Sequence, residues 1–226
     1  MAVAIHLAEV RTRIRQAAIH AGRDPESVRL VAVSKTKPVD MIREALEAGQ
    51  TDFGENRVQE MQAKYPELPE VRWHLIGTLQ TNKVKYIAPY VHLIHSVDST
   101  RLLAEIDRQA GKVGRTLDCL LQLHISDEAT KSGMDETEAA QIVEQIDLYP
   151  HIRIRGLMGM AALTDDRALI RQQFRSLRIA SGVLSAVSHP RVEMQELSMG
   201  MSGDFDIAIE EGATLVRIGS AVFGGR

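Results

Sequence analysis

The strongest constraint on the fold is a regular alternation of short apolar runs with longer helical patterns along the chain. The runs are rich in β-branched residues, whereas the segments between them repeat apolar residues at helical spacing. The expected strands cover residues 28–34, 51–54, 72–76, 91–97, 117–125, 152–158, 192–197 and 214–218. The expected helices between them cover residues 38–48, 57–64, 81–87, 99–110, 136–147, 166–186 and 204–211. This order indicates an α/β fold built on a parallel sheet.

Two architectures accommodate such an alternation: a closed (β/α)8 barrel and an open doubly wound sheet. Equivalent units joined by right-handed crossovers favour closure, so the sequence predicts a single (β/α)8 barrel domain over residues 1–226. A further N-terminal helix is expected over residues 3–21, ended by Gly22 and Pro25. Few residues follow Ile218, so this opening helix is expected to cover the outside of the barrel beside the last strand.

Composition and charge argue against several classes of partner. The formal net charge of -3 offers no basic field for nucleic acid, so neither DNA nor RNA is expected. No stretch approaches the roughly 18 apolar residues of a membrane span, and the N-terminus lacks a signal-peptide core. The single Cys119 lies in an apolar run and is expected to be a buried, reduced thiol. A soluble protein of the reducing cytoplasm is therefore expected.

The residues that follow each expected strand are the candidates for chemistry, because barrel sites form at the carboxyl ends of the strands. The first strand runs into Ser34–Pro38, where Lys35 continues the inward phase of Val31 and Val33. Burial at the barrel mouth would lower the pKa of an amine and make it nucleophilic toward an aldehyde, as a Schiff base requires. A solvated surface lysine is the alternative. Lys37 competes for the same role, but it lies beyond the strand end, which favours Lys35.

The segment Leu197–Asp204, which joins the seventh strand to its helix, is rich in glycine and serine. In barrels the loops after strands seven and eight commonly bind phosphate, because glycines let backbone amides approach an anion. Ser202 adds a hydroxyl donor, and Gly219 and Ser220 after strand eight are expected to face the same anion. A plain helix cap at Ser202 or Asp204 and a simple turn at Gly219 are the alternatives. Asp204 would repel a dianion, so it is assigned to capping or to solvent.

Arg217 shares the inward phase of Leu215 and Gly219, which points a permanent cation into the barrel beside the expected phosphate loop. It is expected either to pair with a carboxylate or to donate to a ring nitrogen of a ligand.

Asn56, after the second strand, is expected to contact the ligand. His74 is expected to be a satisfied core or rim histidine, and the other histidines show no spacing typical of a metal site.

Several motifs in register resemble the pyridoxal phosphate homeostasis protein family. They are Val33–Pro38, Phe53–Asn56, Trp73–Gly77, Leu79–Lys83, Leu197–Ser202 and Val216–Gly219, and the similarity runs from about residue 28 to Arg226. The resemblance implies a barrel like the N-terminal domain of alanine racemase, with pyridoxal 5′-phosphate held on Lys35 as an internal aldimine. It also implies roles for the remaining candidates: Asn56 beside the cofactor ring, Ser202 with Gly219 and Ser220 on the phosphate, and Arg217 facing the pyridine nitrogen. His124 stands where relatives are expected to carry asparagine, so its role is open.

The resemblance further implies a protein of cofactor homeostasis or carriage, without catalytic residues for a committed reaction. Enzymes like alanine racemase take an opposing tyrosine base from a second domain, and this sequence ends at Arg226 before one. Arginine does not readily release a proton, so Arg217 would leave the ring nitrogen unprotonated and disfavour carbanion chemistry. A racemase or decarboxylase is the enzymatic alternative, and a scaffold without ligand would leave Lys35 unexplained. Amino acids and transient contacts with pyridoxal phosphate-dependent enzymes complete the expected partners.

Overall fold

Eight parallel strands close into a barrel in the computed structural model, which describes residues 2–126 and 133–225. Each strand pairs with the next strand along the chain. The eighth strand pairs with the first and closes the barrel, and in this pair Val31 lies opposite Arg217. The strands are β1 (Arg29–Val33), β2 (Asp52–Glu55), β3 (Arg72–Leu75), β4 (Leu93–Val97), β5 (Leu117–Gln122), β6 (Ile152–Met158), β7 (Val192–Ser198) and β8 (Leu215–Ile218). The predicted (β/α)8 barrel is confirmed, and the open doubly wound sheet is wrong.

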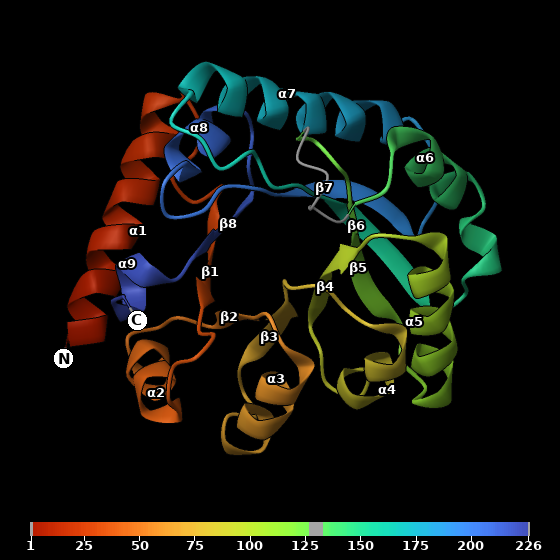
Figure 1. Ribbon diagram of the computed structural model, residues 1–226, viewed down its shortest axis with the longest axis horizontal. Coiled ribbons are helices and arrows are strands. Elements are labelled where there is room, and N and C mark those ends of the chain that lie inside the picture. Colours follow the sequence, from red (N-terminus) through yellow and green to blue (C-terminus); the bar gives the residue numbers. More distant parts are fainter. Residues whose placement is uncertain (1, 127–132, 226) are drawn as a thin grey trace.

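Helices surround this barrel and connect its strands (Figure 1). They are α1 (Ala2–His20), α2 (Val39–Glu47), α3 (Val58–Lys64), α4 (Val84–Ile87), α5 (Thr100–Lys112), α6 (Glu136–Glu144), α7 (Arg167–Leu184), α8 (Phe205–Glu210) and α9 (Ser220–Phe223). Short 3-10 turns cover Tyr65–Glu67, Thr81–Lys83 and Ile146–Leu148. The helix expected over residues 81–87 is therefore a 3-10 turn that continues into α4.

The opening helix α1 lies against α8 and α9, beside the point where β8 meets β1 (Figure 1). It buries Val3, Leu7, Val10, Ile14 and Ala18, which recur at helical spacing along one side. Only the short α9 follows β8 in the described part of the chain, so α1 supplies the cover that a longer helix would otherwise give. The expected place of the N-terminal helix is confirmed.

The apolar core has two parts, one on each side of the strands. The larger part fills the space between the strands and the helices, and it includes the buried Cys119, whose thiol pKa is raised by burial. The smaller part lies inside the barrel and consists of Val31, Leu93, Leu120, Met158 and Leu215. Since so few apolar side chains fill the interior, polar groups occupy much of the remaining space inside the barrel.

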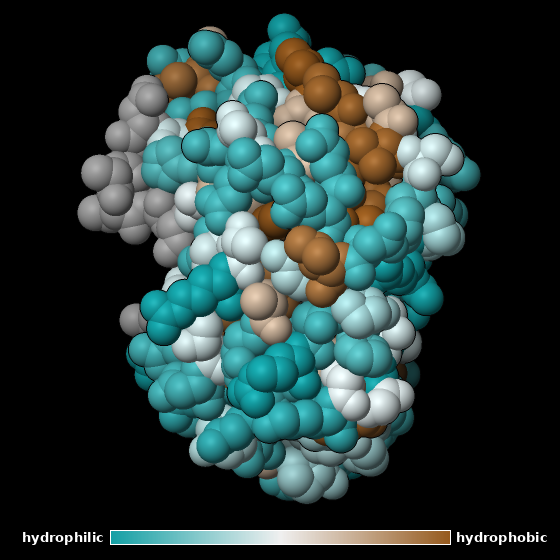
Figure 2. Space-filling model, turned by 90° about the vertical axis from the view of Figure 1, so that its right-hand side faces the viewer, coloured by the Kyte–Doolittle hydropathy of each residue, from teal (hydrophilic) through white to brown (hydrophobic). Residues whose placement is uncertain are grey.

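The surface of the helical layer is mainly polar. Helix α5 turns Leu102, Leu103, Ile106 and Ala110 inward, which leaves its charged residues outside. The side of the molecule that lies at the right in Figure 1 is accordingly hydrophilic over most of its area, with apolar side chains gathered mainly in the upper half of the view (Figure 2). Throughout residues 2–126 and 133–225, every helix is too short or too polar to cross a bilayer.

Strand β5 ends at Gln122, three residues before the expected boundary at residue 125. The carbonyl of Gln122 accepts a hydrogen bond from the Met134 amide at 2.9 Å, and the His124 amide donates to the Met134 carbonyl at 3.1 Å. The Leu123 amide still donates to the Met158 carbonyl of β6 at 2.9 Å, so the barrel pairing ends at Leu123 and the chain passes to a second partner, Met134. Apolar pattern alone does not reveal this change of partner, because both environments bury Leu123.

Candidate functional site

Two neighbouring pockets open where β1, β2 and β8 end. The larger has a volume of about 660 Å³, and Lys35, Asn56 and Glu60 are among its lining residues. The smaller has a volume of about 250 Å³ and includes Lys35, Gly219 and Ser220. Because Lys35 lines both, the structure brings this lysine together with Asn56 on one side and with Gly219 and Ser220 on the other.

The two candidate lysines differ in what their amines contact. Lys37 Nζ donates hydrogen bonds to the carbonyl oxygens of Gly224 at 3.0 Å and Gly225 at 2.9 Å. Within the described ranges, the Lys35 amine has no hydrogen-bond or ion-pair partner. Lys37 is therefore held by the chain itself, whereas Lys35 presents an uncommitted amine at the pockets.

Lys35 is exposed, so the expectation that burial would activate its amine is wrong for this structure. Strand β1 ends at Val33, the Ser34 amide still donates to the Gly54 carbonyl of β2 at 3.0 Å, and Thr36 has a φ of 64° in the left-handed region. The chain thus turns away directly after Lys35, and the side chain stands at the rim rather than inside the barrel. A non-glycine residue in this conformation beside a pocket is typical of a functional turn.

A buried ionic network holds the residues on either side of Lys35. Glu55 Oε1 accepts hydrogen bonds from Ser34 Oγ and from Lys64 Nζ, both at 2.7 Å. Lys64 Nζ also donates to the Ser34 carbonyl at 2.9 Å and to Glu60 Oε1 at 2.7 Å. Burial raises the pKa of Glu55 despite these contacts. The network therefore ties the end of β1 to β2 and α3.

The same network reaches the residue after Lys35, because Glu60 also accepts a hydrogen bond from the Thr36 amide. Glu55 lies within the motif Phe53–Asn56, but the sequence patterns single out neither it nor Lys64. The available signal was the spacing of Glu60 and Lys64, four residues apart on one helix.

The serines expected to bind phosphate meet at the rim of the barrel. Ser220 Oγ lies 3.3 Å from Ser202 Oγ, although the two residues belong to different loops. Among the described residues, no acceptor bonds the backbone amides of Ser202 and Gly203. A β-carbon on Gly219 would approach the Val33 carbonyl to 3.0 Å, so this position favours the absence of a side chain. Hydroxyls and free amides together form a cradle of donors suited to an anion.

Asp204 takes neither of the roles expected for it. Its Oδ1 accepts a hydrogen bond from the Met201 amide at 2.6 Å, and its side chain gives no cap to α8. The residue is buried, and this burial raises the pKa of its carboxyl group. Gly200 has a φ of 91° and lies against Ala208. The loop after β7 therefore folds back over the carboxylate of Asp204. Ser202 does not cap α8 either, because that helix begins at Phe205.

Arg217 is buried inside the barrel, as its strand phase predicts. Its guanidinium donates to Ser198 Oγ at 2.6 Å and to the Gly159 carbonyl at 3.2 Å. Burial lowers the pKa of Arg217 to about 10, and the charge of Asp204 acts in the opposite direction. No carboxylate of the described residues pairs directly with it, so the ion-pair alternative is wrong there. Arg217 does not line either pocket and lies deeper than Lys35.

Asn56 and His124 occupy contrasting positions. Asn56 is half-buried in the larger pocket, and its backbone passes so close to Gly77 that a β-carbon there would lie 2.3 Å from its carbonyl oxygen. Gly77 thereby lets the β3 loop pack tightly against Asn56. His124 is exposed beyond the end of β5 and belongs to neither pocket.

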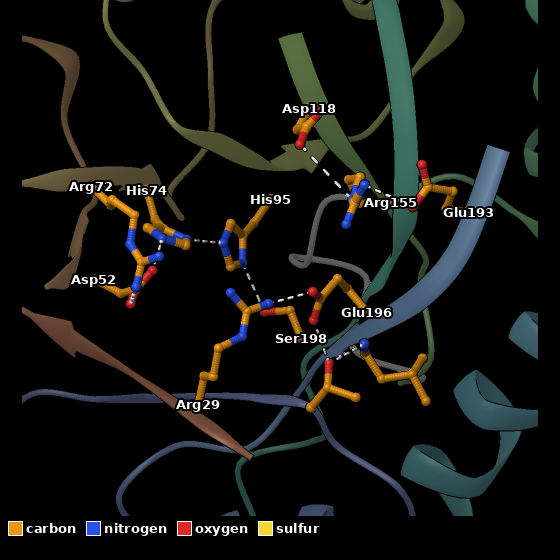
Figure 3. Close-up of polar contacts among 12 residues, drawn as sticks. Arg29, Asp52, Arg72, His74, His95, Asp118, Arg155, Glu193, Glu196 and Ser198 are labelled. Carbon is orange, nitrogen blue, oxygen red and sulfur yellow. Dashed lines mark hydrogen bonds and ion pairs between the residues drawn. The ribbon is translucent and has the colours of Figure 1, made fainter. Parts of the chain in front are cut away.

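Polar side chains continue from Arg217 across the inside of the barrel in a row that the sequence patterns do not single out. His95 Nδ1 lies 2.8 Å from Ser198 Oγ, and His95 Nε2 lies 2.9 Å from His74 Nδ1. His74 Nε2 in turn lies 2.9 Å from Asp52 Oδ1 (Figure 3). His74 is thus a satisfied core histidine, as expected. The signal for the row was the inward phase that these residues share on β2, β3, β4, β7 and β8.

Asp52, His74 and His92 come close enough to raise the question of a metal, since their ligand atoms lie within 4.8 Å of one another. Both ring nitrogens of His74 are already hydrogen-bonded, and Asp52 forms an ion pair with Arg72. A cation would have to displace these contacts beside an arginine. The arrangement therefore favours a hydrogen-bonded cluster rather than a metal centre.

Comparison with known proteins gives consistent matches over the whole chain. A family model described as the N-terminal domain of alanine racemase matches residues 5–226. A pyridoxal phosphate homeostasis protein of Pseudomonas aeruginosa is 42% identical over 226 residues, covering 99% of this chain and 96% of that protein. The protein of the same name from Vibrio alginolyticus is 40% identical over 227 residues, covering 98% and 96% respectively. PipY of Synechococcus elongatus, solved with PLP bound, is 39% identical with a TM-score of 0.86 and covers 98% of this chain and 100% of its own.

Proposed function

Since the chain belongs to the pyridoxal phosphate homeostasis protein family, we propose that it binds pyridoxal 5′-phosphate as a Schiff base on Lys35 and serves in the homeostasis of that cofactor. The observation that carries the proposal is the uncommitted amine of Lys35 between two pockets. Its competitor Lys37 is bonded to backbone carbonyls. The PLP bound in the PipY structure supports the identity of the ligand.

The residues around the pockets fit the chemical groups of this cofactor. Lys35 would hold the aldehyde carbon, and the donors of Ser202, Gly219 and Ser220 would hold the phosphate. Asn56 would lie beside the ring, and Arg217 would face the pyridine nitrogen. A pocket of about 660 Å³ falls within the range of about 300 to 1,000 Å³ that small-molecule sites occupy. When bound, the cofactor supplies an aldehyde that condenses with amines and a ring that withdraws electrons.

The exposure of Lys35 favours carriage over catalysis. Committed reactions usually proceed where the protein excludes water, because charges then interact strongly and side reactions are suppressed. Here the amine stands at an open rim, where water and free amines reach it. An accessible position allows the cofactor to be acquired and released, and it allows amino acids to exchange with Lys35.

The acid and base groups of a racemase or decarboxylase are also poorly represented. Glu60 is the single carboxylate among the described residues that line the pockets, and it is bonded to Lys64 and to the Thr36 amide. The guanidinium of Arg217 offers donors only, so it would leave the ring nitrogen unprotonated and limit electron withdrawal. We therefore infer binding without a committed reaction.

The absence of turnover is a testable part of the proposal. The cofactor-loaded protein, incubated with single enantiomers of common amino acids in deuterated water, is expected to retain their α-protons and their optical purity. NMR and chiral chromatography would follow both quantities. Turnover of any amino acid at or above roughly 1 per second, the low end of ordinary enzyme rates, would show that the protein is an enzyme.

Replacing Ser202 by alanine tests the phosphate cradle. The change removes one donor to a dianion and is expected to weaken cofactor binding by about 1 to 3 kcal/mol, as measured by titration. Pyridoxal, which has no phosphate, is expected to bind the unmodified protein much more weakly. Ser185→Ala is the matched control, because this hydroxyl lies at the end of α7 and donates to the Gly182 carbonyl. Equal affinities for the two vitamers would contradict the assignment of the cradle.

The proposal extends to setting and partners. The buried thiol of Cys119 is consistent with a reducing cytoplasm, in which unpaired cysteines persist. Transfer of the cofactor implies transient contact with enzymes that depend on it, and exchange at Lys35 implies contact with free amino acids. Binding assays with such enzymes in the presence of the loaded protein would test the first of these contacts.

A further inference from the structure

Hydrogen bonds run without interruption across the inside of the barrel from β2 to β8. The row joins Asp52, His74, His95, Ser198 and Arg217, with successive distances of 2.9, 2.9, 2.8 and 2.6 Å. Each of these residues is buried, and both histidines and the serine are 0% exposed. Figure 3 shows the part from Asp52 to Ser198, with each ring turned edge-on toward its neighbours in the row.

The two ends of the row determine the direction of its outer hydrogen bonds. A guanidinium has N–H donors and no acceptor, so Arg217 donates and Ser198 Oγ accepts. An ionised carboxylate has acceptors and no donor, so His74 Nε2 donates to Asp52. Hydrogen bonding to His74 and burial act on Asp52 in opposite directions, and the net effect lowers its pKa well below the usual range.

The hydrogen-bond distances fix the direction of the inner bonds once both rings are neutral. Burial lowers the pKa of His74 and lowers that of His95 well below its usual value, which favours the neutral form of both rings. A neutral His74 that donates through Nε2 has a lone pair at Nδ1, which must accept from His95 Nε2. His95 then has a lone pair at Nδ1, which accepts the hydroxyl proton of Ser198.

A reversed direction requires an additional buried charge. If His95 were neutral and donated through Nδ1, its Nε2 lone pair would face the Nδ1 lone pair of His74 at 2.9 Å. Protonation of His74 would remove that repulsion, but it would place a third cation near Arg29 and Arg72, which already lower the pKa of His74. The direction from Arg217 to Asp52 is thus the one that leaves every member satisfied.

We propose that His95 is a positioning residue, which acts through Ser198 to hold Arg217 as a fixed donor toward the bound cofactor. The Ser198 hydroxyl donates its single proton to His95 Nδ1, so its oxygen can only accept a hydrogen bond from the guanidinium of Arg217. With the Gly159 carbonyl as the second contact, the plane of Arg217 is held from two sides. Among the described residues, the other N–H groups of its guanidinium have no hydrogen-bond partner. The identity of the ring that they meet rests on the proposed function above.

The tautomers provide a test that does not depend on the cofactor. Long-range proton–nitrogen NMR spectra of the full-length ¹⁵N-labelled protein distinguish the two neutral tautomers and the imidazolium ion. His74 and His95, assigned by the signals lost in single variants, are both expected as neutral rings protonated at Nε2 at neutral pH. A charged ring or a ring protonated at Nδ1 at either position would overturn the proposed direction, whether or not the protein binds pyridoxal phosphate.

Substitutions test the effect on the site itself. His95→Phe and Ser198→Ala are each expected to raise the cofactor dissociation constant about tenfold or more, as loss of a hydrogen bond to a charged group predicts. They are also expected to shift the absorption maximum of the bound cofactor. His95→Gln retains one donor and one acceptor and should recover most of the affinity and the spectrum.

His92→Gln is the matched control, because its ring lies 5.3 Å from His74 by centroid distance and outside the row. It should leave both the affinity and the spectrum unchanged. Unchanged binding and spectrum in correctly folded His95→Phe would overturn the positioning role. Equal losses in His95→Phe and His95→Gln would overturn it as well. If the phenylalanine variant fails to fold, the NMR measurement on the unmodified chain still decides the direction of the row.

Discussion

Lys35→Ala is expected to abolish the borohydride-stable adduct between this protein and pyridoxal phosphate. A Schiff base needs a free amine at the aldehyde, and Lys35 is the pocket lysine whose amine has no partner among the described residues. Its side chain is exposed, so the substitution should leave the fold intact. Loss of visible absorbance from the bound cofactor and loss of the mass increment after reduction would both report the effect.

Lys37→Met separates the two neighbouring lysines. This variant should keep the adduct, because Lys37 holds the carbonyls of Gly224 and Gly225 rather than the cofactor. Some loosening of the chain end is expected, and with it a modest loss of affinity. Peptide mapping that located the reduced cofactor on Lys37 or Lys83 in the unmodified protein would contradict the assignment of Lys35.

Lys64→Met is expected to lower the free energy of unfolding by about 3 to 5 kcal/mol, the usual cost of removing one partner from a buried ion pair. Methionine preserves much of the apolar volume, so the loss would come mainly from leaving Glu55 buried without its cation. Glu55 is 0% exposed, and among the described residues its Oε2 has no hydrogen-bond partner even with Lys64 present. Urea denaturation followed by circular dichroism would measure the change.

A double variant identifies the cause of that loss. Glu55→Gln combined with Lys64→Met removes both charges, so much of the stability lost in the single variant should return. Lys112→Met is the matched control, since this lysine is exposed at the end of α5 and its loss should change stability by less than about 0.5 kcal/mol. A loss below about 1 kcal/mol for Lys64→Met would show that the ion pair contributes little.

The network of Lys64 also links stability to the site. Its contacts hold Ser34 and Thr36 on either side of Lys35 through Glu55 and Glu60. Lys64→Met is therefore expected to reduce the yield of the Lys35 adduct even at temperatures where the variant remains folded. This effect would distinguish a network that orients the rim from one that only stabilises the core.

The sequence by itself determined the architecture and the positions of the candidate residues. Alternation of apolar runs and helical patterns is a local property, and each strand or helix imposes its period on its own residues. For the same reason the inward phase of Arg217 and the convergence of Ser202 with Ser220 followed from strand order alone. Motifs in register then indicated the family that the comparisons show.

Only the tertiary structure decided how these residues are partnered. The exposure of Lys35 depends on where β1 ends its hydrogen bonds with the neighbouring strands and on the left-handed turn at Thr36. The spacing of apolar residues in the sequence reveals neither feature. The roles of Asp204 and Lys64 depend on contacts made by a folded-back loop and by a neighbouring helix. The row from Asp52 to Arg217 joins residues of five strands. Hydrogen-bond partners distant in the chain are selected by three-dimensional closure of the barrel, which local sequence patterns do not encode.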